Sequence, residues 1–260
     1  MDFMTDVTAK ELAETLKAMP AQDLQSALKD SALLGFDTET TGLDCKKDAI
    51  ISAALVLRKS AGGESLKTCD KVAQWLINPG VSINEIASKI NGFTDEYVKK
   101  NGAEPQSSLQ EIAEIIVAAN EKNIPLLAYN ASFDVRMLEG DLERYQMTDL
   151  AKALRDSLLV VDPLVIDRTV SKRAGRRTLT DTTFYYGVQP RGSFHDATAD
   201  TIAAIDLVKP MSDLYPQVGQ LALKDLMQWQ TEAHCAWIES YNRYAEEKGK
   251  PKRTDKWLKG

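Results

Sequence analysis

The sequence predicts an α/β protein, with a mixed sheet flanked by helices and helical extensions at both ends. Three short apolar runs, 32–38, 49–57 and 72–77, are bounded by turn residues and are typical of consecutive strands. Two further runs, 125–130 and 158–161, alternate with segments whose apolar residues recur at helical spacing. This alternation favours one five-stranded sheet with helices packed against it.

The first segment, residues 1–30, is expected to be a helical extension. Thr8 and Glu11 fit a capping box that opens a helix, and Pro20 interrupts the helical pattern. The apolar runs typical of strands begin just after this segment, so we place the main domain at residues 31–210.

Within the main domain, helices are expected at 83–90, 95–99, 109–116, 133–145 and 197–208. A further helix should begin at Asp162 and Pro163, because aspartate caps free amides and proline is favoured in the first turn. Residues 171–191 are expected to form a mobile connection.

The C-terminal segment, residues 211–260, is predicted to hold one long helix over 216–247 and a basic tail. The helix carries several aromatic residues, including Trp229 and Trp237. They could close the core, or they could contact a second copy of the chain or a DNA polymerase.

Composition indicates a globular protein with one substantial core, since 43% of the 260 residues are hydrophobic. The formal net charge of −6 argues against a broadly basic surface for nucleic acid. An enzyme that holds a few terminal nucleotides through cations and main-chain amides needs no such surface.

Only two histidines are present, His195 and His234, and the cysteines are odd in number and far apart. A metal site in this chain must therefore consist mainly of carboxylates, which suits Mg²⁺ or Mn²⁺. His234 lies on the apolar stripe of the long helix, where a structural role is expected.

No basic leader or long apolar run is visible in the sequence. We therefore expect a soluble, cytoplasmic protein that makes no contact with a membrane.

The strongest chemical pattern is Phe36-Asp37-Thr38-Glu39-Thr40-Thr41-Gly42-Leu43, at the end of the first predicted strand. Because side chains alternate along a strand, Asp37 and Glu39 should point to one face and could share a cation. Gly42 permits a tight turn beside them.

Two further patterns lie at predicted helix starts. Asp134 falls in a first turn, where the helix end stabilises negative charge, and Asn130 could cap that helix or reach a ligand. His195 precedes a later helix, and Asp200 lies one turn inside it. Each pattern alone is ordinary helix-start chemistry.

Together, Asp37 with Glu39, then Asp134, then His195 with Asp200 resemble the three motifs of the DEDDh family of 3′–5′ exonucleases. The chain looks similar to proofreading epsilon subunits and their stand-alone homologues over residues 31–210. The resemblance implies a ribonuclease H-like fold and hydrolysis of single-stranded DNA from its 3′ end. Asn91 stands where the family usually has histidine.

On this hypothesis two divalent ions bind the four carboxylates. Asp37 would bridge both ions, Glu39 and Asp200 would bind the first, and Asp134 would hold the second. His195 is the predicted general base, because imidazole titrates near neutrality.

Contacts to the strand are predicted from two kinds of residue. One kind lies near the motifs, and the other consists of cations in the 171–191 connection. The residues expected to contact the strand are Thr38, Thr41, Gly42, Leu43, Phe93, Asn130, Arg176 and Arg177.

Three alternatives stay open at this stage. The same site could trim RNA, because any of several loop residues could read a 2′-hydroxyl. The chain could instead be a polymerase-associated binding subunit without activity, or an acidic protein with a structural cation.

Overall fold

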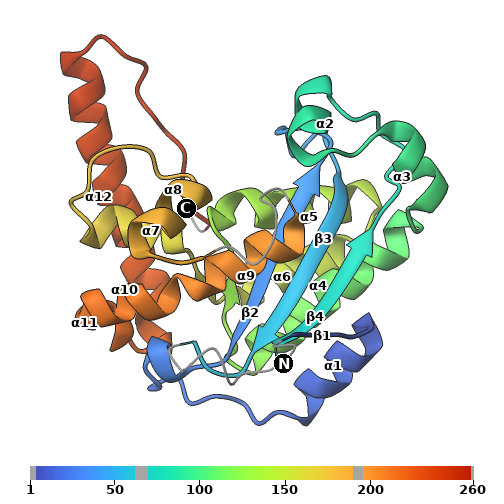
Figure 1. Cartoon of the computed structure of the whole chain (residues 1–260), viewed down its shortest axis with the longest axis horizontal. Coiled ribbons are helices and arrows are strands. Elements are labelled where there is room, and N and C mark those ends of the chain that lie inside the picture. The colour runs from blue at the N-terminus through green and yellow to red at the C-terminus, as the bar shows by residue number, and fades with distance from the viewer. Residues whose placement is uncertain (1–3, 62–69, 190–195, 259–260) are drawn as a thin grey trace.

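The computed structural model describes residues 4–61, 70–189 and 196–258, so the predicted base His195 lies outside the described residues. Its centre is a six-stranded sheet with the order β1-β4-β3-β2-β5-β6 (Figure 1). The strands are β1 (Met4–Asp6), β2 (Leu33–Thr40), β3 (Ile50–Arg58), β4 (Asp70–Leu76), β5 (Leu126–Leu127) and β6 (Val160–Val161).

The sheet is mixed, as predicted. β2 pairs antiparallel with β3 and parallel with β5, and β5 pairs parallel with β6. The expected number of five strands was one too low, because β1 pairs parallel with the edge of β4. β1 has only three residues and all are exposed, so no apolar pattern marks it in the sequence.

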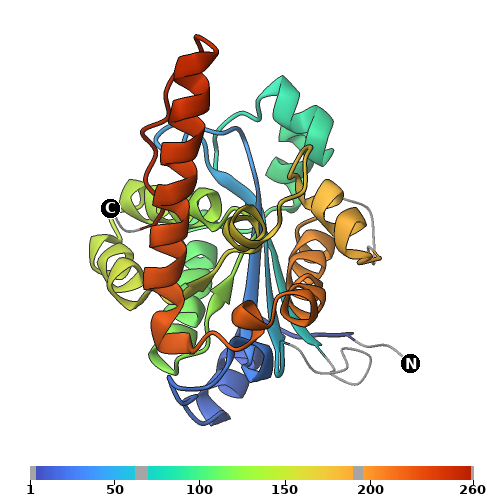
Figure 2. The same ribbon diagram turned by 90° about the vertical axis from the view of Figure 1, so that its left-hand side faces the viewer.

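Helices cover both faces of the sheet, which Figure 2 shows nearly edge-on. The helices are α1 (Ala9–Ala18), α2 (Glu85–Asn91), α3 (Asp95–Asn101), α4 (Pro105–Glu121), α5 (Ala131–Arg144), α6 (Thr148–Ser157), α7 (Pro163–Val170), α8 (Leu179–Tyr186), α9 (Ala197–Asp206), α10 (Val208–Leu214), α11 (Pro216–Gly219) and α12 (Leu226–Glu247). α4, α5 and α6 lie on one side of the sheet, and α9 and α10 on the other.

The alternation of β2 explains this two-sided core. Leu34 and Phe36 pack into the cluster formed with α4 and α5, while Leu33 packs into the cluster formed with α9 and α10. All three side chains are fully buried. β2 is therefore fixed from both faces, and its C-terminal end becomes a rigid support for the residues that follow.

The N-terminal helix begins as the sequence predicts. The Thr8 hydroxyl accepts a hydrogen bond from Glu11 N, and the Glu11 carboxylate accepts one from Thr8 N. Leu12 and Leu16 are fully buried, so α1 is part of the main core.

Two predicted segments differ in the structure. The expected connection over 171–191 contains α8, whose start is capped by the Thr178 hydroxyl. The expected single helix over 216–247 is divided into α11, a 3-10 turn and α12. At the division, a side chain on Gly219 would come within 2.8 Å of Ser212, so the chain packs closely against α10 there.

The C-terminal tail folds back along α12 after that helix ends (Figure 1). Trp257 is only 3% exposed and packs into the core, and its indole donates a hydrogen bond to Asp162. Over the described parts of the chain, no helix is both long and apolar enough to cross a membrane.

Candidate active site

Three of the predicted metal ligands meet at the end of β2. Asp37, Glu39 and Asp200 each offer a carboxylate oxygen, and these atoms lie within 4.8 Å of one another. Asp37 and Glu39 share one face of β2, as strand alternation predicts, and Asp200 comes from the first turn of α9. With Asp134, we call these residues the acidic cluster.

The position of Asp200 depends on how closely α9 approaches β2. A side chain on Gly35 would lie 2.5 Å from atoms of Thr201 and Ile205, so only glycine permits this contact. At the other end of α9, Asp206 pairs with the buried Arg58 at 2.5 Å. The helix is thereby held against the sheet with Asp200 facing the acids of β2.

Asp134 is attached to β2 through Thr38. Its Oδ1 accepts hydrogen bonds from Thr38 N at 3.1 Å and from the Thr38 hydroxyl at 2.7 Å. Asp134 is only 3% exposed. Thr38, predicted as a substrate contact, therefore also positions a carboxylate.

The start of α5, the helix that carries Asp134, is capped by Asp162 and not by the Asn130 side chain. Asn130 has φ 66° and makes no side-chain cap. Instead, the buried Asp162 accepts hydrogen bonds from Asn130 N and Ala131 N, both at 3.0 Å. Asp162 also caps α7 through Leu164 N, as predicted, so one carboxylate orients two helices.

Burial and mutual proximity raise the pKa values of the carboxyl groups in the acidic cluster. Burial raises the pKa of Asp37 well above its ordinary value, and the charges of Asp134 and Asp200 raise it further. Burial, together with the Asp200 charge, raises the pKa of Glu39 to about 8. Burial raises the pKa of Asp134 to about 7 despite its hydrogen bonds from Thr38. The protein alone therefore holds these charges at a cost in free energy.

An open cavity of about 400 Å³ adjoins the acidic cluster, and we call it the terminal pocket. Its lining includes Glu39, Gly42 and the apolar side chains of Leu43, Ile86 and Ile90. These three side chains are 85%, 69% and 52% exposed, which is unusual for apolar groups of this size.

The other residues predicted to contact the substrate in this region do not all line the terminal pocket. Thr41 is fully buried and donates a hydrogen bond to Asp48, and the same carboxylate would collide with any side chain on Gly42. Phe93 does not line the terminal pocket, and its ring packs 6.1 Å from that of Tyr97. Asn91 does line the pocket and donates a hydrogen bond to Thr40 O.

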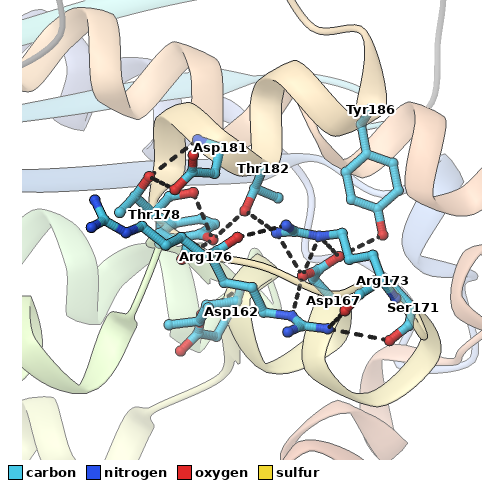
Figure 3. Close-up of polar contacts among 12 residues, drawn as sticks. Asp162, Asp167, Ser171, Arg173, Arg176, Thr178, Asp181, Thr182 and Tyr186 are labelled. Carbon is cyan, nitrogen blue, oxygen red and sulfur yellow. Dashed lines mark hydrogen bonds and ion pairs between the residues drawn. The ribbon is translucent and has the colours of Figure 1, made fainter.

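The two arginines predicted to contact the strand, Arg176 and Arg177, differ in their surroundings. Arg177 Nε lies 2.8 Å from the buried Asp167, whereas Arg176 is exposed. Asp167 also pairs with Arg173 at 3.0 Å and accepts a hydrogen bond from Tyr186 at 2.8 Å (Figure 3). This Asp167 network joins α7, α8 and the chain between them. A role for either arginine in binding phosphate stays a prediction.

Comparison with known proteins agrees with this geometry. A sequence model of the exonuclease family, of the RNase T type, matches residues 34–208. PolC-type DNA polymerase III of Streptococcus thermophilus is 32% identical over 132 residues, which cover 50% of this chain and 8% of the polymerase. The Staphylococcus epidermidis enzyme is 27% identical over 192 residues, which cover 72% of this chain and 12% of the polymerase. The chain thus corresponds to a small part of these relatives.

Solved structures show the same fold. E. coli exonuclease I, in a zinc-bound complex with single-stranded DNA, superposes with a TM-score of 0.59 at 19% identity over 73% of this chain and 42% of that one. Exonuclease I of Methylocaldum szegediense gives 0.58 at 19% identity over 80% and 45%. The predicted ribonuclease H-like fold is confirmed.

The match covers most of the main domain and includes every member of the acidic cluster. The resemblance predicted from the motifs is therefore confirmed: this chain belongs to the exonuclease family.

Proposed function

We propose that the protein is a metal-dependent 3′–5′ exonuclease, which removes nucleoside monophosphates from the end of single-stranded DNA. The observation that carries this proposal is the convergence of Asp37, Glu39 and Asp200 within 4.8 Å. Acids brought together in this way from β2 and α9 repel one another unless a cation joins them.

The donor set fits Mg²⁺ or Mn²⁺, because among the described residues it consists of carboxylate oxygens alone. Asp37, Glu39 and Asp200 would hold one ion, and Asp134 would help to hold a second. When bound, the ions would lower the pKa of a water molecule and neutralise charge on the phosphate.

The protein side chains would orient the reaction around these ions. Thr38 holds Asp134 in place through two hydrogen bonds, and Gly35 lets Asp200 approach β2. His195 is proposed to accept the proton of the attacking water as a general base, a common role of histidine.

The terminal pocket is proposed to hold the last nucleotide. Leu43, Ile86 and Ile90 offer an apolar surface to the base, and Asn91 and Gly42 lie beside them. Contact with such a surface would tolerate any sequence, because every base presents a flat face. Thr38 and Phe93 are proposed to add contacts at its margin.

DNA is the favoured substrate for two reasons. The two bacterial relatives are named as DNA polymerases, and the E. coli neighbour was crystallised with single-stranded DNA. We place the activity in proofreading or repair of DNA in the cytoplasm. Association with a polymerase or with a second copy through α12 belongs to the same proposal.

The test uses oligonucleotides labelled at the 3′ or 5′ end, incubated with Mg²⁺, Mn²⁺ or a chelator. A 5′ label should give a ladder of shortened strands, a 3′ label should be released as mononucleotide at once, and the chelator should stop both. Matched RNA strands measure sugar preference, and Asp213→Asn, an exposed acid on α10, is the control variant. Shortening that proceeds equally in chelator would refute the proposal.

A further inference from the structure

A second cavity lies beside the candidate active site, and we call it the arginine pocket. Its volume is about 280 Å³, and it shares Leu43 and Phe133 with the terminal pocket. Its polar lining includes the side chains of Asn130, Ser132, Arg136, Arg168, Arg253 and Asp255.

The arginine pocket combines two regions of the chain. α5 and α7 belong to the part that matches the exonuclease family, whereas Arg253 and Trp257 come from the tail beyond it. The tail is fixed here by several contacts: Trp257 donates to Asp162 at 3.2 Å, and Arg136 donates to the carbonyls of Lys256 and Trp257 at 2.5 and 3.3 Å. The tail therefore forms a fixed wall of the pocket.

Arg168 is the most informative residue in this pocket. Its guanidinium lies 3.9 Å from the centre of the Trp237 ring and is half-buried. Among the described residues it makes no ion pair and donates no hydrogen bond, although a guanidinium carries five N–H groups. Burial lowers its pKa, and the nearby Asp162 charge offsets this only in part.

Among the described residues, no acid of the pocket lies at ion-pair distance from Arg168 or Arg136. The Asp162 carboxylate is buried and already accepts from two amides of α5, one amide of α7 and the Trp257 indole. Asp255 is paired with Arg253 at 2.9 Å and lies 3.9 Å from His234. Within the described chain, two guanidinium groups are thus left facing the cavity without a carboxylate at ion-pair distance.

Neutral donors complete the lining. The Asn130 side chain makes no cap, and neither it nor the Ser132 hydroxyl has a hydrogen-bond partner among the residues described. Guanidinium, amide and hydroxyl groups around one cavity are the chemistry that recognises a phosphate group.

We propose that the arginine pocket binds the phosphate groups of the strand just 5′ to the terminal nucleotide. This inference rests on the proposed function and names where the rest of the substrate lies. With the last nucleotide in the terminal pocket and the bond to be broken at the acidic cluster, the preceding nucleotide passes Leu43 and Phe133 into the arginine pocket. Local arginines then hold the strand although the whole chain carries a net charge of −6.

The experiment compares two substrates that differ only in upstream phosphates. One is a 12-nucleotide strand, as DNA and as RNA, and the other is the p-nitrophenyl ester of thymidine 5′-monophosphate, which has a single phosphate. For Arg168→Gln, the ratio of kcat/KM for the strand to kcat/KM for the ester should fall about tenfold. The slope of log Kd against log salt for the strand should also decrease by about 0.7, the value for one lost contact.

Matched variants make the test decisive. Arg168→Lys keeps the charge and should retain most of the salt slope. Arg253→Gln should also lower the ratio of kcat/KM for the strand to kcat/KM for the ester, and it serves as the test if Arg168→Gln fails to fold. Arg155→Gln removes an arginine from an exposed pair with Glu143 and should leave both substrates as in wild type. A wild-type ratio in both pocket variants would overturn the inference alone. Wild type that cleaves neither substrate would overturn the proposed function, and this inference with it.

Discussion

Two groups of buried carboxylates in this protein differ in what balances their charge. Asp167 is fully buried and is surrounded by Arg173, Arg177 and the Tyr186 hydroxyl. In the acidic cluster, by contrast, no lysine or arginine among the described residues lies at ion-pair distance from Asp37, Glu39 or Asp134. The first group is balanced within the protein itself, whereas the second is the proposed site of divalent cations.

This difference separates structure from function in one fold. A carboxylate matched by arginines stabilises the contact between α7 and α8, and its removal should harm folding. A carboxylate left among other carboxylates opposes folding, and its value lies in what it binds. The two groups should therefore respond oppositely to the same substitution.

Asp37→Asn should cause the largest loss of activity. It removes the shared ligand of the acidic cluster but keeps the shape of the side chain, so kcat/KM on single-stranded DNA should fall by about a thousandfold or more. In the absence of metal, the variant should melt at or above the temperature of wild type, because a repelling charge is gone. Gel assays and thermal melting measure both effects, and a variant with wild-type activity would remove Asp37 from the site.

His195→Ala tests the part of the mechanism that lies outside the described residues. Removal of a general base should lower kcat by a factor of about 10²–10⁴. Metal and strand binding should persist, because no ligand is lost, whereas Asp37→Asn loses metal binding as well. Calorimetric titration of Mn²⁺ into both variants separates the two cases. Equal rates for His195→Ala and wild type would contradict the assignment.

Asp167→Asn should act on stability. Arg173 and Arg177 would lose their buried partner, at a cost of about 3 kcal/mol in the free energy of unfolding. Denaturant titration measures this loss, and magnesium should not restore it. If the variant proved as stable as wild type, the Asp167 network would have no structural role.

The smallest effect concerns pH. Glu39 and Asp134 have pKa values raised to about 8 and 7, so between pH 4.5 and 8 the metal-free folded protein binds more protons than the unfolded chain. Its free energy of unfolding should therefore fall as pH rises through this window.

Two further measurements sharpen the pH prediction. Glu39→Gln should weaken the dependence, and magnesium at pH 8 should restore stability by binding the ionised form. Metal-free protein that became more stable from pH 5 to 8 would show that these carboxylates are not destabilised by burial.

The local parts of this site are predictable from sequence. The shared face of Asp37 and Glu39 follows from strand alternation, and the capping box at Thr8 is formed as expected. The capping of α8 was also visible in principle, since Thr178 and Asp181 have the spacing of a helix start.

The parts that depend on distant residues could not be predicted in the same way. The amides at the start of α5 bond to Asp162, 32 residues later in the chain, and not to the adjacent Asn130 side chain. The Arg177 guanidinium pairs with Asp167, although its sequence neighbours suggested a phosphate contact. Burial of Trp257 beside Asp162 likewise depends on how the tail folds back, which no local pattern encodes.

The most direct test of the central claim is a crystal of the protein with a single-stranded oligonucleotide and Mn²⁺, measured for anomalous scattering. We predict anomalous peaks at coordination distance from Asp37, Glu39 and Asp200, with none at Asp167. Absence of any peak at the acidic cluster while the strand is bound, or a peak only elsewhere, would show that these carboxylates do not form the metal site.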